Sequence, residues 1–434
     1  MKQIITILLA FVMGICVCRS QESVVSLDEC QQAADRNFPA IAAYDLIDQL
    51  ADFNISNARR NWLPKISLNA LVSYLSDVPA LPDNVTTLLH QLGVESGTFP
   101  EFQYGAALQV RQTVWDGGAV RAGVRTIDAQ RQLQHAKLDA DIYALRQRVN
   151  QLYFGSLLLQ QKLRSIEILL EDLCRNFNTL NVMADCGKAD ANDPDLLYVE
   201  ILAARQQHEE VNALREAYVA MLAIMTGLPL SGETILEKPV CDAVPEDDNS
   251  SLRPELNIFD ARNALLDAQV GAINASVMPH VFAFVTGGYS NPSPNVFRCL
   301  SAAGKPYPYL FAGVGLSWSL DGFYTRRNRL AQVSADRRQI DIDREVFLYD
   351  TRLQSVRERA AIRKLQETMR YDDEIIERRA SIRRRTEARV ANAECCVNDL
   401  LRDMNAEELA RQNKLIHEVE LLESIFELKN TVNK

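Results

Sequence analysis

The sequence has few residues that break helices, and they are missing from long stretches. It holds 18 Gly and 15 Pro among 434 residues. Gly155 is the only Gly or Pro between Gly123 and Cys186, no Pro follows Pro308, and no Gly follows Gly322. Runs of this length without a breaker predict long helices rather than a compact globule of short ones.

The sequence also lacks the patterns of several functional classes. Its net charge is -10, which argues against a nucleic-acid partner. The cysteines have no Cys-x-x-Cys spacing, and the number left after removal of a signal peptide is odd, so no disulfide framework, zinc site or redox motif is predicted. The five histidines are scattered. We therefore expect no enzyme activity and no cofactor or metal.

Only the N-terminus carries a long apolar run. Lys2 precedes apolar residues 4–17, and small residues suit cleavage before Gln21, so residues 1–20 are predicted to be a signal peptide. A lipid anchor at Cys16 or Cys18 is the alternative, which the large residues before both cysteines disfavour. No later uncharged run reaches the roughly 20 residues of a membrane helix.

The two halves of the chain share a spaced pattern. Two prolines and a tyrosine recur with both internal spacings preserved: Pro39, Pro64 and Tyr74, then Pro254, Pro279 and Tyr289. Pro is tolerated near a helix start and stops a helix that reaches it, so each proline pair brackets a helix. This predicts a first repeat over residues 21–227, a linker over 228–252 and a second repeat over 253–434.

Alternating apolar and polar residues follow each closing proline. They predict two strand pairs, at residues 65–76 and 102–115 and at residues 280–290 and 309–321. Each strand is near the roughly 9 to 11 residues that a tilted strand needs to cross a bilayer. Four strands cannot close a barrel, which needs about eight, so several subunits must share one barrel.

The rest of each repeat is helical. Apolar residues step by four and three from Leu145 to Ala184, the period of a coiled coil. A helix over residues 118–183 would be on the order of 100 Å long. A return helix is predicted after Pro194. In the second repeat the heptad fades, and a return helix is predicted near Asn392.

Short motifs at fixed places carry a family resemblance. They are Trp62-Leu63-Pro64, the turn Val114-Trp115-Asp116-Gly117-Gly118 with Arg121, and Asp-Leu-Leu at residues 195–197 and 399–401. With the duplication and the signal peptide, the chain resembles the TolC-type outer-membrane efflux proteins. The resemblance implies a mixed α and β, internally duplicated fold. Long α-helical hairpins would form a periplasmic tunnel, and four strands would enter a shared 12-stranded trimeric transmembrane β-barrel.

The resemblance also implies a role and partners. The chain would be a homotrimer in the cell outer membrane with a periplasmic extension, and the outer-membrane channel of a tripartite efflux or type I secretion system. It would be a passive conduit for small molecules or polypeptides. Its partners would be a periplasmic adaptor (membrane fusion) protein, an inner-membrane transporter and outer-membrane lipid.

Both hairpin tips are the implied functional sites. The candidate adaptor-contact residues are Gly187, Asp195, Leu196, Leu197, Ala393, Leu400 and Leu401, and the candidate pore-aperture residues are Asp399, Arg402 and Asp403. The family usually has Gly where the second tip has Ala393, and some members have a second acid where Arg402 stands. A ring of carboxylates would select cations, whereas the plainer interpretation is that Asp399 complements a helix macrodipole.

Other features keep two interpretations. The arginines at 378, 379, 383, 384, 385 and 389 could dock an acidic partner, but a solvated helix face is favoured. Cys186 and the Cys395-Cys396 pair could form a redox latch or soft-metal site, but unpaired small apolar residues are favoured. For the whole chain, the rival function is a periplasmic coiled-coil adaptor or stalk without a barrel, which the four amphipathic strands disfavour.

Overall fold

The structure is a computed structural model that describes residues 24–78, 81–93, 99–186, 190, 192–240, 253–294, 306–392 and 394–433. The predicted signal peptide lies outside these residues. The chain forms two compact units that interleave along the sequence. Unit 1 comprises residues 1–43, 137–256 and 344–434, and unit 2 comprises residues 44–136 and 257–343. The long helices α5 (Ala119–Asp185) and α9 (Gly322–Met369) contribute to both units.

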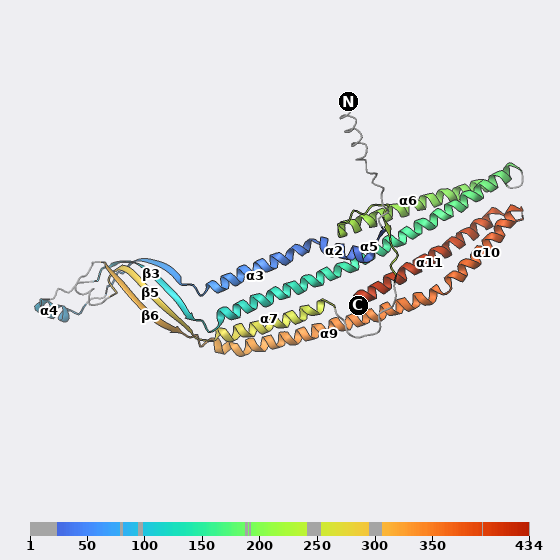
Figure 1. Cartoon of the computed structure of the whole chain (residues 1–434). Coiled ribbons are helices and arrows are strands. Elements are labelled where there is room, and N and C mark those ends of the chain that lie inside the picture. Colours follow the sequence, from blue (N-terminus) through green and yellow to red (C-terminus); the bar gives the residue numbers. More distant parts are fainter. Residues whose placement is uncertain are drawn as a thin grey trace, which may run out of the picture. The chain divides into compact units, whose positions relative to one another are not determined.

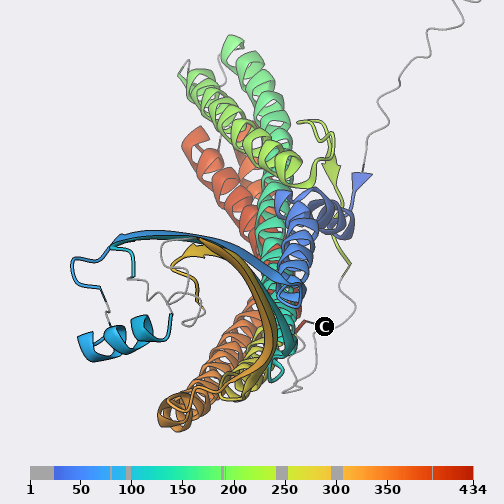
Figure 2. The same cartoon turned by 90° about the vertical axis from the view of Figure 1, so that its left-hand side faces the viewer.

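Unit 2 contains a four-stranded antiparallel sheet, drawn as arrows in Figure 1. Its strands, in spatial order, are β2 (Lys65–Tyr74), β3 (Phe102–Trp115), β5 (His280–Asn291) and β6 (Tyr307–Ser317). Figure 2 shows that the sheet is strongly curved. The last strand ends at Ser317, earlier than the predicted residue 321. The ring nitrogen of the next residue, Trp318, donates a hydrogen bond to the carbonyl of Val277 at 3.0 Å. Among the described residues, each of the outer strands, β2 and β6, pairs with a strand on one side alone.

One side of this sheet, the apolar face, is formed by side chains that alternate with polar ones, as the sequence pattern predicts. Leu68 pairs with Leu108, and Val285 pairs with Ala312, so the same side is apolar across the strands. Large exposed residues of the apolar face are Ile66, Leu68, Val72, Tyr74, Leu108, Val285, Tyr289, Leu310, Val314 and Leu316. Within the part of the chain that the structure describes, this face is largely exposed; Leu310, for example, is 76% exposed.

The segment between the first two strands contains a short helix. Helix α4 (Asp83–Gln91) begins after Pro82, whose carbonyl accepts hydrogen bonds from the amides of Val85 and Thr86. The fixed φ of proline prepares the first turn of a helix. The remaining helices of this unit are α3 (Ala42–Arg60) and α7 (Glu255–Ser276), each ending shortly before a closing proline.

The turn from β3 into α5 explains the Asp-Gly-Gly motif. The Asp116 carboxylate accepts hydrogen bonds from the amides of Gly118 and Val120, at 2.9 and 2.7 Å. Gly117 and Gly118 have φ of 66° and 88°, a region that other residues rarely adopt. Asp116 therefore caps the long helix while the two glycines reverse the chain.

Unit 1 is built from helices around two small parallel strands. β1 (Val24–Val25) pairs with β4 (Ile235–Leu236), and the Tyr153 hydroxyl donates to the carbonyls of Val25 and Glu237. The helices of this unit, besides parts of α5 and α9, are α2 (Leu27–Asn37), α6 (Asp193–Thr226), α10 (Asp372–Ala391) and α11 (Val397–Val432), with the 3-10 turn η1 (Pro39–Ile41). The largest core side chains around the strands are Tyr153, Phe154, Leu157 and Leu222.

The second repeat has a helix break that the sequence does not signal. Although residues 323–434 hold no Gly or Pro, α9 ends at Met369 and α10 begins at Asp372. The Tyr371 amide donates to the carbonyl of Thr368, three residues back, so the helix tightens locally. Asp372 is buried there, and its carboxylate lies 2.8 Å from the ring nitrogen Nδ1 of His417 in α11. Among the described residues, no helix is both long and apolar enough to span a membrane.

Candidate functional site

The first tip joins α5 to α6. Of the residues predicted to contact an adaptor, Asp195 is exposed and Leu196 is 41% exposed, whereas Leu197 is 0% exposed. Gly187 lies outside the described residues. The tip therefore offers a carboxylate and one leucine to the outside, and uses the next leucine as core.

The start of α6 follows from its first residues. Pro194 occupies the first turn, where its missing N–H has no helical partner to lose. Asp193 and Asp195 add negative charge at the helix N-terminus, which the macrodipole favours. The chain before it is shaped by Asp190, whose carboxylate accepts from the amide of Asn192 at 3.0 Å.

The second tip joins α10 to α11, and Asp399 lies in the first turn of α11. The thiols of Cys395 and Cys396 both donate to its Oδ2 atom, each at 3.2 Å. These two hydrogen bonds, with the nearby charges of Arg402 and Arg389, hold the pKa of Asp399 below its usual value. Asp399 is thus an ionised, partly exposed carboxylate. Ala393 lies outside the described residues.

The three predicted aperture residues do not share one environment. Arg402 is exposed, and its guanidinium lies 3.4 Å from Oδ1 of Asp399. Asp403 is buried and accepts a hydrogen bond of 2.7 Å from the Thr386 hydroxyl of α10. Of the three, Asp399 and Arg402 therefore present charge at the surface of this tip, whereas Asp403 does not.

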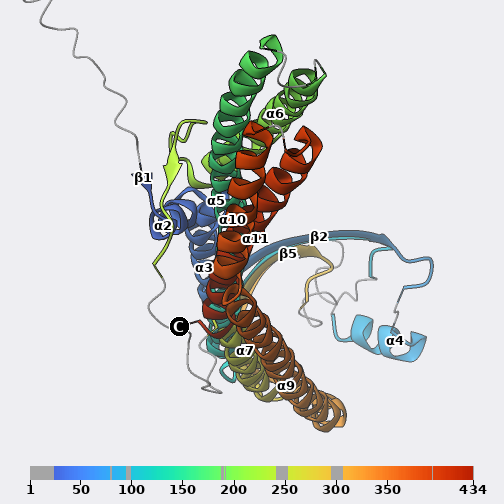
Figure 3. The same ribbon diagram turned by 90° about the vertical axis from the view of Figure 1, so that its right-hand side faces the viewer.

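Below the tips, four helices of unit 1 share one apolar core. Figure 3 shows the α5–α6 hairpin beside the α10–α11 hairpin. The buried residues of this tip core are Leu173, Leu180, Leu197, Ile201, Ala204, Val390, Val397, Leu400, Leu401 and Met404. Leu400 and Leu401, predicted as adaptor contacts, therefore hold the two hairpins together within the chain.

An ion network at the same level was not singled out from the sequence. Arg383 is 16% exposed, and its guanidinium lies 2.7 Å from Glu407 of α11 and 3.3 Å from Asp172 of α5. Arg378, by contrast, pairs only along its own helix with Glu374, as a solvated face would. The available signal in the sequence was the heptad spacing: Arg383 precedes Thr386 by three residues, which indicates that the two lie on one face of the helix, and Thr386 is buried.

The cysteines of the tips are free thiols. Cys186 and Cys396 are exposed, and Cys174 and Cys395 are partly buried. Cys241 and Cys299 lie outside the described residues. Within the part of the chain that the structure describes, no group of three or more His, Cys, Asp or Glu side chains is arranged to hold a metal ion.

Comparison with known proteins agrees with this architecture. Residues 30–228 match the family model described as outer membrane efflux protein. No curated protein matches the sequence. The matched family is one of efflux proteins rather than enzymes, and its match covers most of the first repeat.

Several solved structures share the fold over nearly the whole chain. The outer-membrane channel OprN is 16% identical, with a TM-score of 0.67 over 94% of this chain and 89% of its own. The CmeC outer membrane channel of Campylobacter jejuni is 12% identical, with a TM-score of 0.64 over 94% and 85%. The outer membrane protein VceC of Vibrio cholerae is 14% identical, with a TM-score of 0.62 over 94% of both chains. The family match and the fold confirm the resemblance to TolC-type outer-membrane efflux proteins.

Proposed function

We propose that this chain is the outer-membrane channel of a tripartite efflux or type I secretion system. The observation that carries the proposal is the apolar face of the sheet, whose side chains alternate with those of the opposite face along every strand. The described residues of one chain leave it exposed. On a water-soluble monomer, an apolar face that spans four strands would promote aggregation, whereas in a membrane lipid chains cover it. In this role the channel is a passive conduit for small molecules or polypeptides, and the inner-membrane transporter supplies the energy.

The sheet supports a trimeric barrel. Its edges, β2 and β6, are open, and four strands are too few to close a barrel. Three chains supply twelve strands, with β6 of one chain pairing with β2 of the next and the apolar faces turned toward outer-membrane lipid. The long helices then line a periplasmic tunnel.

The hairpin tips are the proposed contact with a periplasmic adaptor protein, and through it with an inner-membrane transporter. Asp195 and Leu196 are exposed at the first tip and support this role. Leu197, Leu400 and Leu401 support it indirectly, because they pack the tip core that holds the contact surface in shape.

The proposed aperture charge comes from Asp399, with Arg402 beside it. Three copies of Asp399 around a narrow opening would favour cations, and three copies of Arg402 would oppose that preference. Removing the arginine with Arg402→Ala should therefore raise cation selectivity, and Asp399→Ala should lower it.

The rival function, a periplasmic adaptor or stalk without a barrel, would leave the apolar face of the sheet in water. The state of the native protein separates the two. We expect the protein to fractionate with the outer membrane, to need detergent for extraction and to have the mass of three chains in the detergent complex. Extraction by buffer alone as a monomer would favour the stalk.

A further inference from the structure

The side of the sheet opposite the apolar face carries a row of aromatic rings, here called the aromatic row. It consists of Phe282, Phe284, Phe311 and Tyr309. The strand register places all four on one side, because Phe284 and Phe311 lie diagonally across β5 and β6. Successive ring centroids are 6.1, 5.7 and 6.3 Å apart, so each ring contacts the next.

Glycines make room for the aromatic row. A Cβ atom at Gly288 would lie 2.7 Å from the Tyr309 ring, and one at Gly313 would lie 3.0 Å from the Phe284 ring. The rings therefore lie across the neighbouring strand. Phe311 is nevertheless 53% exposed, so the row remains open on its outer side.

Two cations lie at the helical end of the row. The Arg111 guanidinium is 4.1 Å from the centre of the Phe282 ring, and Lys65 is the cross-strand partner of Arg111. In the described parts of the chain, neither Lys65 nor Arg111 has a carboxylate within ion-pair distance. Asp116, which lines the same cavity as Lys65 and Arg111, accepts hydrogen bonds from the two amides that it caps.

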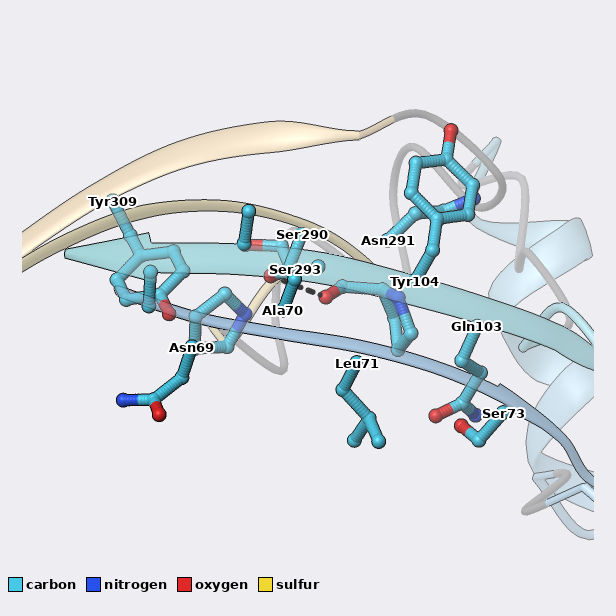
Figure 4. Close-up of a pocket in the computed structure, with 15 residues that line it drawn as sticks. Asn69, Ala70, Leu71, Ser73, Gln103, Tyr104, Ser290, Asn291, Ser293 and Tyr309 are labelled. Atoms are coloured by element: carbon cyan, nitrogen blue, oxygen red, sulfur yellow. Dashed lines mark hydrogen bonds between the residues drawn. The ribbon is translucent and has the colours of Figure 1, made fainter. Parts of the chain in front are cut away.

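Each end of the row opens into a cavity. The cavity at the helical end, about 480 Å³, is lined by Lys65, Arg111 and Phe282, together with His280. The cavity at the other end, about 430 Å³, is lined by Tyr309 with amide and hydroxyl groups from β2 and β3. Figure 4 shows this second cavity, with Asn69 and Ser73 pointing to one side of the sheet and the Tyr104 ring to the other.

We propose that the aromatic row, with Lys65 and Arg111 at one end, is a binding track for planar aromatic anions. The cations attract a carboxylate or sulfonate, and the exposed Phe311 ring, between the half-buried Phe284 and Tyr309, stacks on an aromatic body. The inference rests on the proposed function for one step: with the apolar face toward lipid, the row faces the water-filled interior of the channel. An aromatic ring exposed to water lowers solubility, so its presence in that interior is better explained by binding of a ligand.

The competing explanation is that the rings only brace the sheet, as cross-strand aromatic pairs do. The two explanations differ in ligand selectivity. A brace is indifferent to solutes, whereas a track distinguishes an aromatic anion from a saturated anion of the same charge.

The test compares naphthalene-2-sulfonate with cyclohexanesulfonate as blockers of single-channel current in planar bilayers. We expect only the aromatic anion to interrupt the current at low concentration. The triple variant Phe282→Leu, Phe284→Leu, Phe311→Leu should raise its blocking constant about tenfold, since each aromatic pair contributes a factor of a few. Phe102→Leu, a matched variant on the apolar face of the same sheet, should leave the constant unchanged.

The cation is tested separately with Arg111→Gln, which should weaken block severalfold, and with Arg111→Lys, which should largely restore it. Exposed Arg329 of α9 supplies the matched control, Arg329→Gln. If the triple variant does not assemble into channels, the block measured for Arg111→Gln and Arg111→Lys decides whether the row is a binding track. Equal block by both anions, or block unaffected by these variants, overturns the track. Absence of current in the unsubstituted protein contradicts the proposed function instead, and equilibrium dialysis of the two anions against detergent-solubilised protein then decides the track.

Discussion

The hairpins of the two repeats have the same architecture but bury different chemistry. In the first hairpin, the described residues of α5 and α6 bury no charged side chain. α6 buries apolar residues and Thr226, and the buried polar residues of α5 are the neutral Asn150, Ser156, Ser165 and Asn176. In the second hairpin, α10 and α11 bury four carboxylates, Asp372, Asp403, Glu407 and Glu408, together with Thr386 and Thr431. We call the buried face of a hairpin, where its helices pack on their neighbours, its seam. A hairpin can therefore keep its shape while its seam contains charged residues, provided that each buried group finds a partner.

The partners of the second hairpin are specific. Asp403 accepts from Thr386, Glu408 accepts from the Ser165 hydroxyl of α5 at 2.6 Å, and Asp372 contacts His417. The contact between Glu408 and Ser165 joins the second repeat to the first, as does the ion pair of Arg383 with Asp172. The polar seam thus adds selectivity for the neighbouring hairpin, which an apolar seam alone supplies less well.

The largest effect is expected in the apolar seam. Leu197→Ala removes a fully buried side chain from the tip core and should lower the free energy of unfolding by about 2–5 kcal/mol. Denaturant unfolding in detergent measures the change. The adjacent Leu196→Ala, at an exposed position, should change stability by less than about 0.5 kcal/mol. Equal effects at the two positions would refute the assignment of the seam.

A smaller effect is expected in the polar seam. Arg383→Ala leaves the buried Glu407 with Arg411 as its remaining partner, so the loss should be about 1–3 kcal/mol rather than that of a fully orphaned charge. Arg378→Ala on the same helix removes only an exposed pair and should cost less than about 0.5 kcal/mol. The same unfolding assay separates them, and an Arg383 variant as stable as the control would show that the network contributes nothing.

The second repeat should also make stability depend on pH. Burial, followed by the charges of Glu427 and Glu420, raises the pKa of Glu423 to about 7, and burial likewise raises the pKa of Glu358. The pKa of Glu423 is higher in the folded state than in the unfolded state. Its contribution to the free energy of unfolding is therefore full below about pH 4.5 and is lost as the pH rises through about 7.

The Glu423→Gln variant isolates this contribution. It should flatten the dependence of the unfolding midpoint on pH between about 4.5 and 7. Glu209→Gln, in an exposed position on the first hairpin, should leave that dependence as it is. A pH profile unchanged by Glu423→Gln would refute the assignment.

The smallest effect concerns the thiols at the two tips. The hydrogen bond to Asp399, with burial and the Asp399 charge, raises the pKa of Cys395. Asp399→Asn should therefore lower that pKa and speed alkylation of Cys395 near pH 8, measured residue by residue with mass spectrometry. Cys186 at the first tip serves as the internal control, and an unchanged ratio of the two rates would exclude the contact.

The comparison of the hairpins also explains what the sequence could predict. The strand pairs and α5 follow from alternation, from heptad steps and from the lack of breakers, all of which are local. The partner of Arg383 in α5, Asp172, lies 211 residues away, and no local pattern connects them. The heptad faded in the second repeat because polar residues occupy its core positions.

The tip motifs illustrate the same limit. Asp-Leu-Leu marks both helix starts correctly, but the motif does not say which leucine is turned inward; burial of Leu197, Leu400 and Leu401 depends on the facing hairpin. Asp403 was grouped with Asp399 through the family resemblance. It lies four residues later in α11, about one turn further from the tip, where it accepts a hydrogen bond from Thr386 of α10.

The central claim is that this chain forms an outer-membrane channel, and single-channel recording of the purified protein in planar bilayers tests it most directly. We predict discrete currents from a species of three chains, with a cation preference that Asp399→Ala lowers and Arg402→Ala raises. A protein that stays in solution without detergent and produces no current would contradict the channel and favour the periplasmic stalk.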